Sequence, residues 1–248
     1  MQLKGKAAIV TGGARGIGLQ IVTMLVEHGA TAGVIDSDAD TLAKLGGEAP
    51  IIAAAGDVSD PDSVDAALDC LLAQLEGPDL LINNAAIVHN APLVGIADGR
   101  IVQHARADWD RVIATNLSGV FHVTAAVVQR MVAQRRRGLI INISSICAAG
   151  NAGQSAYSAS KAGVNALTVT WARELAPWGI RVAALAPGFV DTETTVRSLR
   201  AETVDEWKKR TLVRRMGTAN EIAAGVRFII ENDFFNGRIL ELDGGLRL

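Results

Sequence analysis

KAAIVTGGARGIG, residues 6–18, decides the fold of this chain. Its first half is a short apolar run that predicts a buried strand, and its second half is a glycine-rich turn. After the turn, Ile21, Val22 and Leu25 recur at helical spacing before Gly29. A strand, a glycine turn and a helix in this order are typical of a βαβ unit that binds a dinucleotide. The stretch therefore predicts an α/β fold and a nucleotide cofactor.

The glycines that set the spacing of this turn are Gly12, Gly16 and Gly18, and Gly13, Arg15 and Ile17 lie between them. Glycines allow the backbone to approach a pyrophosphate, which then lies at the positive end of the helix. The spacing G-x-x-x-G-x-G differs from the common G-x-G-x-x-G pattern, so by itself it also fits an ordinary glycine-rich turn. The cofactor prediction therefore depends on the rest of the chain.

An acidic residue follows the second predicted strand, residues 31–35. Asp36 lies eighteen residues after Gly18, where a carboxylate accepts hydrogen bonds from the adenosine ribose and repels a 2′-phosphate. Arg15 has the opposite tendency, because a cation in the glycine turn could bind that phosphate. Since Asp36 would occupy the space that the phosphate requires, the sequence predicts NAD rather than NADP.

Strands and helices alternate along the remainder of the chain. Five further apolar runs predict strands at residues 51–55, 79–82, 139–143, 180–185 and 238–242. The nearly continuous apolar character of residues 139–143 is typical of a parallel sheet. The 248 residues therefore predict one domain, residues 1–248, with a Rossmann fold: a doubly wound, mostly parallel sheet of seven strands with helices on both faces.

Two segments interrupt the alternation. Residues 87–107 contain proline, glycine and scattered apolar residues, and they are too long for an ordinary loop between a strand and a helix. Residues 189–213 are polar and poorly periodic, which predicts a mobile lid over the substrate. Between them, a long helix at about residues 108–134 carries Asn116 in its middle, where asparagine is unfavourable unless its amide is used.

Tyr157 and Lys161 are four residues apart in a helical pattern that ends at Pro177, so both side chains lie on one face. A cation beside the phenol would lower the tyrosine pKa from about 10 towards working pH. Such a tyrosine can donate a proton to a carbonyl oxygen or accept one from an alcohol. Alone, the pair also fits a partly exposed tyrosine and a surface lysine.

Upstream, Ser144 and Ser145 end a strand at the carboxyl edge where such sheets bind ligands.

Composition excludes several function classes. The net charge of −2 argues against nucleic-acid or membrane binding. The two cysteines lack a C-x-x-C spacing, which suits a reducing compartment, and the four histidines lack metal-ligand spacing. No apolar run approaches the length of a membrane span. We therefore expect a soluble cytoplasmic protein without a metal site, a membrane partner or a nucleic-acid partner.

Taken together, these stretches resemble the short-chain dehydrogenase/reductase family over essentially the whole chain. The motifs are residues 11–18, Asp57-Val58, residues 83–86, Asn116, Ser144-Ser145, residues 157–161 and Pro187-Gly188. The resemblance implies that Tyr157 is the acid/base, that Lys161 sets its pKa and binds a ribose, and that Asn116 holds a proton-relay water.

The resemblance also implies further contacts with the cofactor. Asp57 and Val58 frame the adenine, and Asn84 lies near the ribose. After Pro187, Val190 and Thr192 meet the nicotinamide end.

Two positions depart from the family pattern. The catalytic serine of the family is commonly thirteen residues before the tyrosine, which is the spacing of Ser144. Ser145 is twelve residues before Tyr157 but has the favourable strand phase, so we assign Ser145 and keep Ser144 as the alternative. Ala86 replaces the usual glycine, and its methyl group narrows the approach of the backbone to the cofactor.

Within the family, two features are similar to the type 2 3-hydroxyacyl-CoA dehydrogenases, also called type 10 17β-hydroxysteroid dehydrogenases. They are the long segment between Asn84 and Trp109 and the tail stretches 229–237 and 242–247. Those enzymes are NAD-dependent homotetramers that oxidise 3-hydroxyacyl-CoA esters and some hydroxysteroids. The resemblance implies an NAD-dependent oxidoreductase that interconverts a secondary alcohol of that class and a ketone, and a homotetramer.

Two alternatives remain open. The first is an NADP-dependent 3-oxoacyl-carrier-protein reductase or polyketide ketoreductase of the same fold. The second is a non-catalytic cofactor-binding scaffold or redox sensor. That class would be expected to lack the tyrosine, the lysine or the serine, and all three are present.

Overall fold

A seven-stranded parallel sheet forms the centre of the molecule. The computed structural model describes the backbone of residues 1–45, 50–192 and 201–246. The strands are β1 (Ala7–Thr11), β2 (Thr31–Asp36), β3 (Ile51–Ala55), β4 (Leu80–Asn83), β7 (Gly138–Ile143), β8 (Ile180–Pro187) and β11 (Ile239–Leu242). They lie in the order β11-β8-β7-β4-β1-β2-β3, and every neighbouring pair is parallel. The predicted doubly wound fold is therefore confirmed.

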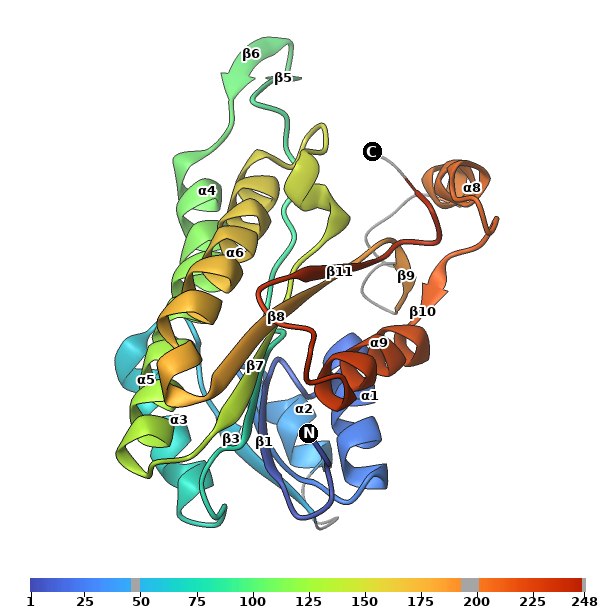
Figure 1. Ribbon diagram of the computed structural model, residues 1–248. Helices are drawn as coiled ribbons and strands as arrows, with labels where there is room; N and C mark the ends of the chain where they lie inside the picture. The colour runs from blue at the N-terminus through green and yellow to red at the C-terminus, as the bar shows by residue number, and fades with distance from the viewer. Residues whose placement is uncertain (46–49, 193–200, 247–248) are drawn as a thin grey trace.

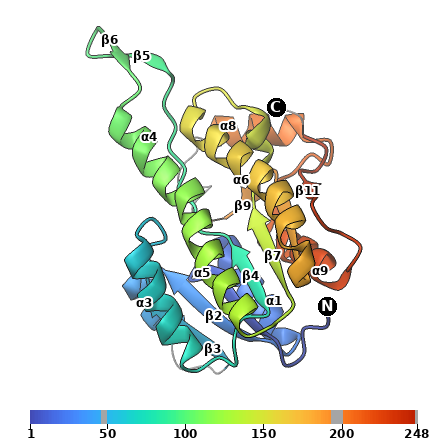
Figure 2. The same cartoon turned by 60° about the vertical axis from the view of Figure 1, so that its left-hand side comes forward.

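Helices cover both faces of this sheet, as Figure 1 and Figure 2 show. One layer contains α1 (Gly16–Glu27), α2 (Ala39–Leu45) and α9 (Ala219–Glu231), and the other contains α3 (Pro61–Leu72), α5 (Gly119–Ala133) and α6 (Ser155–Glu174). Successive side chains of a strand point to opposite faces. In β1, Ala8 and Val10 belong to the first core and Ala7 and Ile9 to the second. This is why the strands are apolar at consecutive positions rather than alternate ones.

The strand order reverses between β1 and β4, and this reversal positions the site. β2 and β3 extend the sheet on one side of β1, whereas β4, β7, β8 and β11 extend it on the other. The two central strands are tied at their carboxyl ends, because the Thr11 hydroxyl oxygen accepts the Asn84 backbone N–H at 3.0 Å. Ligands of open α/β sheets bind in the crevice at such a switch point.

The expectation of an irregular loop over residues 87–107 is wrong for its central part. Strands β5 (Val94–Ala97) and β6 (Arg100–Gln103) form an antiparallel hairpin. It projects beyond α4 (Arg106–Ile113), away from the sheet (Figure 2). The two turn residues, Asp98 and Gly99, have φ of 51° and 71°, as the type I′ turn of a two-residue hairpin requires. Ile96 and Ile101 face each other across the hairpin and are 80% and 81% exposed.

The long helix expected around Asn116 has an interruption at that residue. A π-helical turn, Ala114–Ser118, joins α4 to α5 (Gly119–Ala133). Together the three segments form one continuous helical rod from Arg106 to Ala133. By length and a mean hydropathy of 1.4 this rod could cross a membrane, but a core helix meets the same criteria. Val123 and Val127 on the rod are fully buried in the core beside α3 and α6.

The segment expected to form a lid lies partly outside the described residues, which omit 193–200. Its described part contains β9 (Val190–Asp191) and α8 (Ala201–Arg210). β9 pairs with β10 (Gly217–Thr218), and Phe189 stacks on Trp207 of α8 with ring centroids 4.2 Å apart. α8 is therefore attached to the segment that follows β8.

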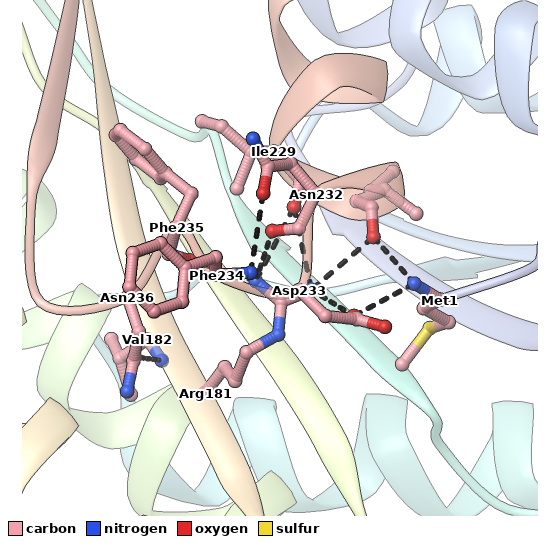
Figure 3. A network of polar contacts seen from close by, with 10 residues as sticks. Met1, Arg181, Val182, Ile229, Asn232, Asp233, Phe234, Phe235 and Asn236 are labelled. Carbon is pink, nitrogen blue, oxygen red and sulfur yellow. Dashed lines mark hydrogen bonds and ion pairs between the residues drawn. The ribbon is translucent and has the colours of Figure 1, made fainter.

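One arginine closes the carboxyl end of α9 (Figure 3). The Arg181 guanidinium donates to the backbone carbonyl oxygens of Ile229, Ile230, Asn232 and Phe235 at 2.8 to 3.4 Å, and to the Asp233 carboxylate at 3.1 Å. Helix C-termini leave carbonyl groups without helical partners. A single cation on β8 satisfies several of them here, and it fixes α9 against the sheet.

Candidate active site

A cleft of about 610 Å³ lies at the carboxyl ends of the central strands. Pockets for small ligands and cofactors typically have this size. All the residues predicted to bind the cofactor line this cleft: Gly12, Arg15, Gly16, Ile17, Gly18, Asp36, Asp57, Val58, Asn84, Tyr157, Lys161, Pro187, Val190 and Thr192. Ala86, the departure from the family pattern, also lines it.

At two positions the backbone of the glycine turn packs too closely against the protein to admit a side chain. Gly12 has φ of +62°, and a Cβ there would lie 2.8 Å from the Ala85 Cα; a Cβ at Gly18 would lie 2.0 Å from the Gly12 carbonyl oxygen. Arg15 is the N-cap of α1, yet its side chain does not bond the first-turn N–H groups. These N–H groups can therefore bind an anion such as a pyrophosphate.

Asp36 is buried at the end of β2, with 8% of its surface exposed. One carboxylate oxygen accepts the Ala14 N–H at 3.1 Å and the other accepts the Asp38 N–H at 3.2 Å. Because an ionised carboxylate can accept about four hydrogen bonds, acceptor capacity remains on the side that lines the cleft. The residues present therefore fit a dinucleotide: amide donors for its phosphates and a carboxylate for its ribose hydroxyls.

Asn84 borders the same cleft, but its side-chain amide is used within the protein. The NH₂ group donates to the carbonyl oxygens of Thr11 at 3.1 Å and Gly12 at 2.8 Å. The residue thereby holds the end of β4 against the glycine turn. Asn84 therefore shapes the wall of the cleft between β4 and the glycine turn.

Tyr157 and Lys161 lie on α6 at the opposite end of the cleft. The Lys161 ammonium is 5.7 Å from the centroid of the Tyr157 ring and donates to the Ile143 carbonyl oxygen at 2.7 Å. The neighbouring Ser145 hydroxyl acts to lower the pKa of Tyr157, and both residues line the cleft. The Ser145 oxygen also accepts the Cys147 N–H at 3.1 Å. A hydroxyl pair beside a cation can bind and protonate a substrate oxygen.

Ser144, the alternative serine, is directed elsewhere. Its hydroxyl donates to the Lys161 backbone carbonyl oxygen at 3.3 Å and is 2% exposed. Ser145 is therefore the serine whose hydroxyl acts on the pKa of the tyrosine. The twelve-residue spacing is accommodated by a short helical turn, Ile146–Ala149, between the serine and α6.

The expectation that the pKa of Tyr157 lies below its ordinary value of about 10 is wrong for this structure. Burial raises the pKa of Tyr157 to about 12, and the neighbouring Cys147 acts in the same direction. Burial also lowers the pKa of Lys161 to about 8. Removing each side chain from water disfavours its charged form. The phenol is therefore protonated at neutral pH, and the ammonium is still largely charged.

Asn116 lies behind the cleft wall and is fully buried. Its amide oxygen accepts the Ile87 N–H at 2.8 Å, and its NH₂ group donates to the Ile87 carbonyl oxygen at 2.9 Å. The amide is thus used, as its place in a helix requires. Its partner is the strand-end segment after β4, so the π-helical turn holds that segment in place.

Residues 148–154 are among the segments that the sequence predicts to shape the substrate pocket, and Gln154 lies at their end. It connects two loops at the mouth of the cleft: its NH₂ group donates to the Asn90 side chain at 2.7 Å, and its oxygen accepts from the Asn151 side chain at 3.0 Å. Ser37, Ser59 and Arg111 also line the cleft. No sequence signal singled them out, because loop contacts carry no periodicity. Among residues 1–45, 50–192 and 201–246, no cluster of three acidic, histidine or cysteine side chains could hold a metal ion.

Comparisons with known proteins agree with this geometry. Residues 6–203 match the family model described as short chain dehydrogenase. The chain is 37% identical over 254 residues to the 3-oxoacyl-[acyl-carrier-protein] reductase FabG of Thermotoga maritima, with 99% of both chains covered. It is 38% identical over 261 residues to the 3-hydroxyacyl-CoA dehydrogenase type-2 of Bos taurus, covering 99% of this chain and 97% of that one. The crystal structure of gox2181 superposes with a TM-score of 0.88 at 31% identity, covering 98% and 97% of the two chains.

Proposed function

Since this chain belongs to the short-chain dehydrogenase family and is an oxidoreductase acting on CH–OH groups, we propose that it uses NAD to interconvert a secondary alcohol and a ketone. The proposed substrate is a 3-hydroxyacyl-CoA ester or a hydroxysteroid-like compound. One observation carries the proposal: Ser145, Tyr157 and Lys161 line the same cleft as Asp36 and the glycine turn.

The roles of the catalytic residues follow from their contacts. In the reductive direction, Ser145 donates a hydrogen bond to the ketone oxygen, and the protonated Tyr157 transfers its proton to that oxygen as the alcohol forms. In the oxidative direction, Tyr157 first releases its own proton to water, and the phenolate so formed accepts the hydroxyl proton of the alcohol. The nicotinamide, when bound, supplies or accepts the hydride. The protein's contribution to the rate comes mostly from positioning the substrate oxygen and from an oriented proton donor.

Lys161 and Asn116 assist the proton transfer, Lys161 by its charge and Asn116 by its position. The Lys161 ammonium stabilises any negative charge on the phenol oxygen, because it lies in a site with little water to screen it. The family resemblance also gives Lys161 a bond to a cofactor ribose and Asn116 a relay water. Asn116 keeps Ile87 fixed at the wall where that water would lie.

The choice of NAD is supported by Asp36, whose buried carboxylate occupies the place of a 2′-phosphate. Asp57 and Val58 form the proposed adenine wall, and Val190 and Thr192 the nicotinamide wall. The test is equilibrium binding of NADH and NADPH to the purified protein, together with turnover with NAD and NADP. Tighter NADPH binding and faster NADP turnover would contradict the choice.

A carrier-protein substrate is the second candidate, because reductases of 3-oxoacyl-[acyl-carrier-protein] are among the relatives, at 37% identity. A panel of 3-hydroxyacyl-CoA esters, hydroxysteroids and 3-oxoacyl carrier-protein thioesters distinguishes the two. Turnover of the carrier-protein thioesters alone would overturn the first choice. A scaffold or redox sensor would give no cofactor-dependent absorbance change with any member.

A homotetramer and a cytoplasmic location complete the proposal. The homotetramer rests on the resemblance to type 2 3-hydroxyacyl-CoA dehydrogenases, and light scattering of the purified protein tests it. The location is supported by Cys70 and Cys147, which are both free thiols.

A further inference from the structure

The turn after β2 contains a second carboxylate beside the cofactor cleft. The Asp38 backbone N–H donates to one oxygen of Asp36 at 3.2 Å. One oxygen of the Asp38 side chain accepts the Thr41 N–H at 3.0 Å. Its other oxygen lies 3.6 Å from a guanidinium nitrogen of Arg15. The Asp38 carboxylate is thus oriented by α2 on one side and faces the glycine turn on the other.

Arg15 is the residue whose charge, in the sequence analysis, favours NADP over NAD. Its side chain is 64% exposed and lines the cleft together with Asp36 and Ser37. A guanidinium there matches the geometry of a phosphate, with which it forms charge-assisted, often bidentate, hydrogen bonds. In this structure its ion-pair partner is Asp38 instead.

We infer that Asp38 is a specificity-determining residue for the cofactor, and that it acts by pairing with Arg15. The inference rests on the proposed use of NAD. Asp36 excludes the 2′-phosphate by occupying its space, whereas Asp38 removes the cation that would compensate for this. Selectivity against NADP therefore has two separable parts.

Asp38 also has a structural task, because it bonds the first turn of α2 (Ala39–Leu45). The Thr41 hydrogen bond lowers the pKa of Asp38, and the charges of Arg15 and Lys44 lower it further. A test must therefore keep the helix cap while it removes the charge. Asp38→Asn does so, because asparagine and aspartate cap helices about equally well.

The experiment measures equilibrium dissociation constants of NADH and NADPH by cofactor fluorescence, without substrate. The proteins are the wild type, Asp38→Asn, Arg15→Gln and the double variant. We expect Asp38→Asn to tighten NADPH binding about fivefold, which corresponds to about 1 kcal/mol at 1.4 kcal/mol per factor of ten. NADH binding should change by less than about twofold, since an exposed charge has little effect on a neutral ribose. In the Arg15→Gln background the same substitution should leave NADPH binding nearly unchanged.

Asp60→Asn is the matched control. Asp60 caps α3 by accepting the Asp62 N–H at 3.1 Å, and it is exposed. The control makes the same charge change at a helix cap that has no arginine partner among the described residues, so NADPH binding should not tighten. The effect of Asp38→Asn should also diminish at high ionic strength, because the groups are exposed.

Three results would overturn the inference: no tightening by Asp38→Asn, equal tightening with and without Arg15, or equal tightening by Asp60→Asn. Equal tightening without Arg15 would mean that Asp38 repels the phosphate directly. Failure of the NAD proposal is seen separately, as tighter binding of NADPH than of NADH by the wild type.

Discussion

The Lys161 ammonium lies 5.7 Å from the centroid of the Tyr157 ring, and its hydrogen bond goes to the Ile143 carbonyl oxygen at 2.7 Å. The lysine thus lies over the tyrosine ring. Its hydrogen bond also ties it to the last residue of β7, immediately before Ser144 and Ser145. One cation therefore links the strand end that carries the serine to the helix that carries the tyrosine.

The two serines provide the first prediction. Ser145→Ala removes the hydroxyl that acts on the pKa of Tyr157, so we expect kcat to fall by about 100-fold or more, as for loss of one donor to a reacting oxygen. Ser144→Ala removes a single bond to the Lys161 carbonyl oxygen, so kcat should fall much less. Steady-state rates under saturating NAD compare the matched pair. A larger loss in Ser144→Ala would reverse the assignment.

The second prediction concerns stability against pH. The pKa of Lys161 is about 8 in the folded protein, below its ordinary value of 10.5. Between these values the unfolded chain binds more protons, so the free energy of unfolding rises with pH across that interval. For a buried amine shifted this far, the rise is at most about 3 kcal/mol.

Lys161→Met serves as the comparison, because methionine fills the space without a titratable group. Urea unfolding of both proteins at several pH values from about 7.5 to 10 isolates the contribution. The difference between the two proteins should shift in favour of the wild type as pH rises. A difference that stays constant with pH would contradict the burial of the ammonium.

The third prediction concerns the network in Figure 3. Arg181→Ala leaves several carbonyl groups at the end of α9 without their donor, and an unsatisfied buried acceptor costs about 1–3 kcal/mol. We expect the free energy of unfolding to fall by roughly 2–4 kcal/mol. Arg181→Lys should recover only part of the lost stability. The ammonium can still donate to some of these carbonyl groups, but it has fewer donors than the planar guanidinium.

The control for this substitution is Arg173→Ala, on the exposed face of α6. Its effect should stay within about 0.5 kcal/mol, as for most surface changes. Equal destabilisation by the two alanine variants in urea unfolding would show that the Arg181 contacts do not hold α9.

The elements with a local sequence signature were predictable. The apolar runs of β1 and β7, the glycines at the start of α1 and Asp36 after β2 all lie where the sequence predicted, because strand period and turn chemistry act over a few residues. The β5–β6 hairpin also had a local signal, the pair Asp98-Gly99 between aliphatic residues. It was missed because exposed isoleucines do not show the alternation of a half-buried strand.

Features that depend on burial or on distant contacts were not predictable. The direction of the Tyr157 pKa depends on how completely the folded chain removes the phenol from water. The pairing of Arg15 with Asp38 and of Gln154 with Asn90 joins loops that are 23 and 64 residues apart. No periodicity in the sequence records such contacts.

Single-turnover hydride transfer in Tyr157→Phe tests the central claim most directly. The phenylalanine keeps the ring beside Lys161 and removes only the hydroxyl group. We predict that NADH binds the variant about as tightly as the wild type, while hydride transfer slows by about 100-fold or more, as loss of a general acid/base requires. Hydride transfer at a rate near that of the wild type would contradict the role of Tyr157.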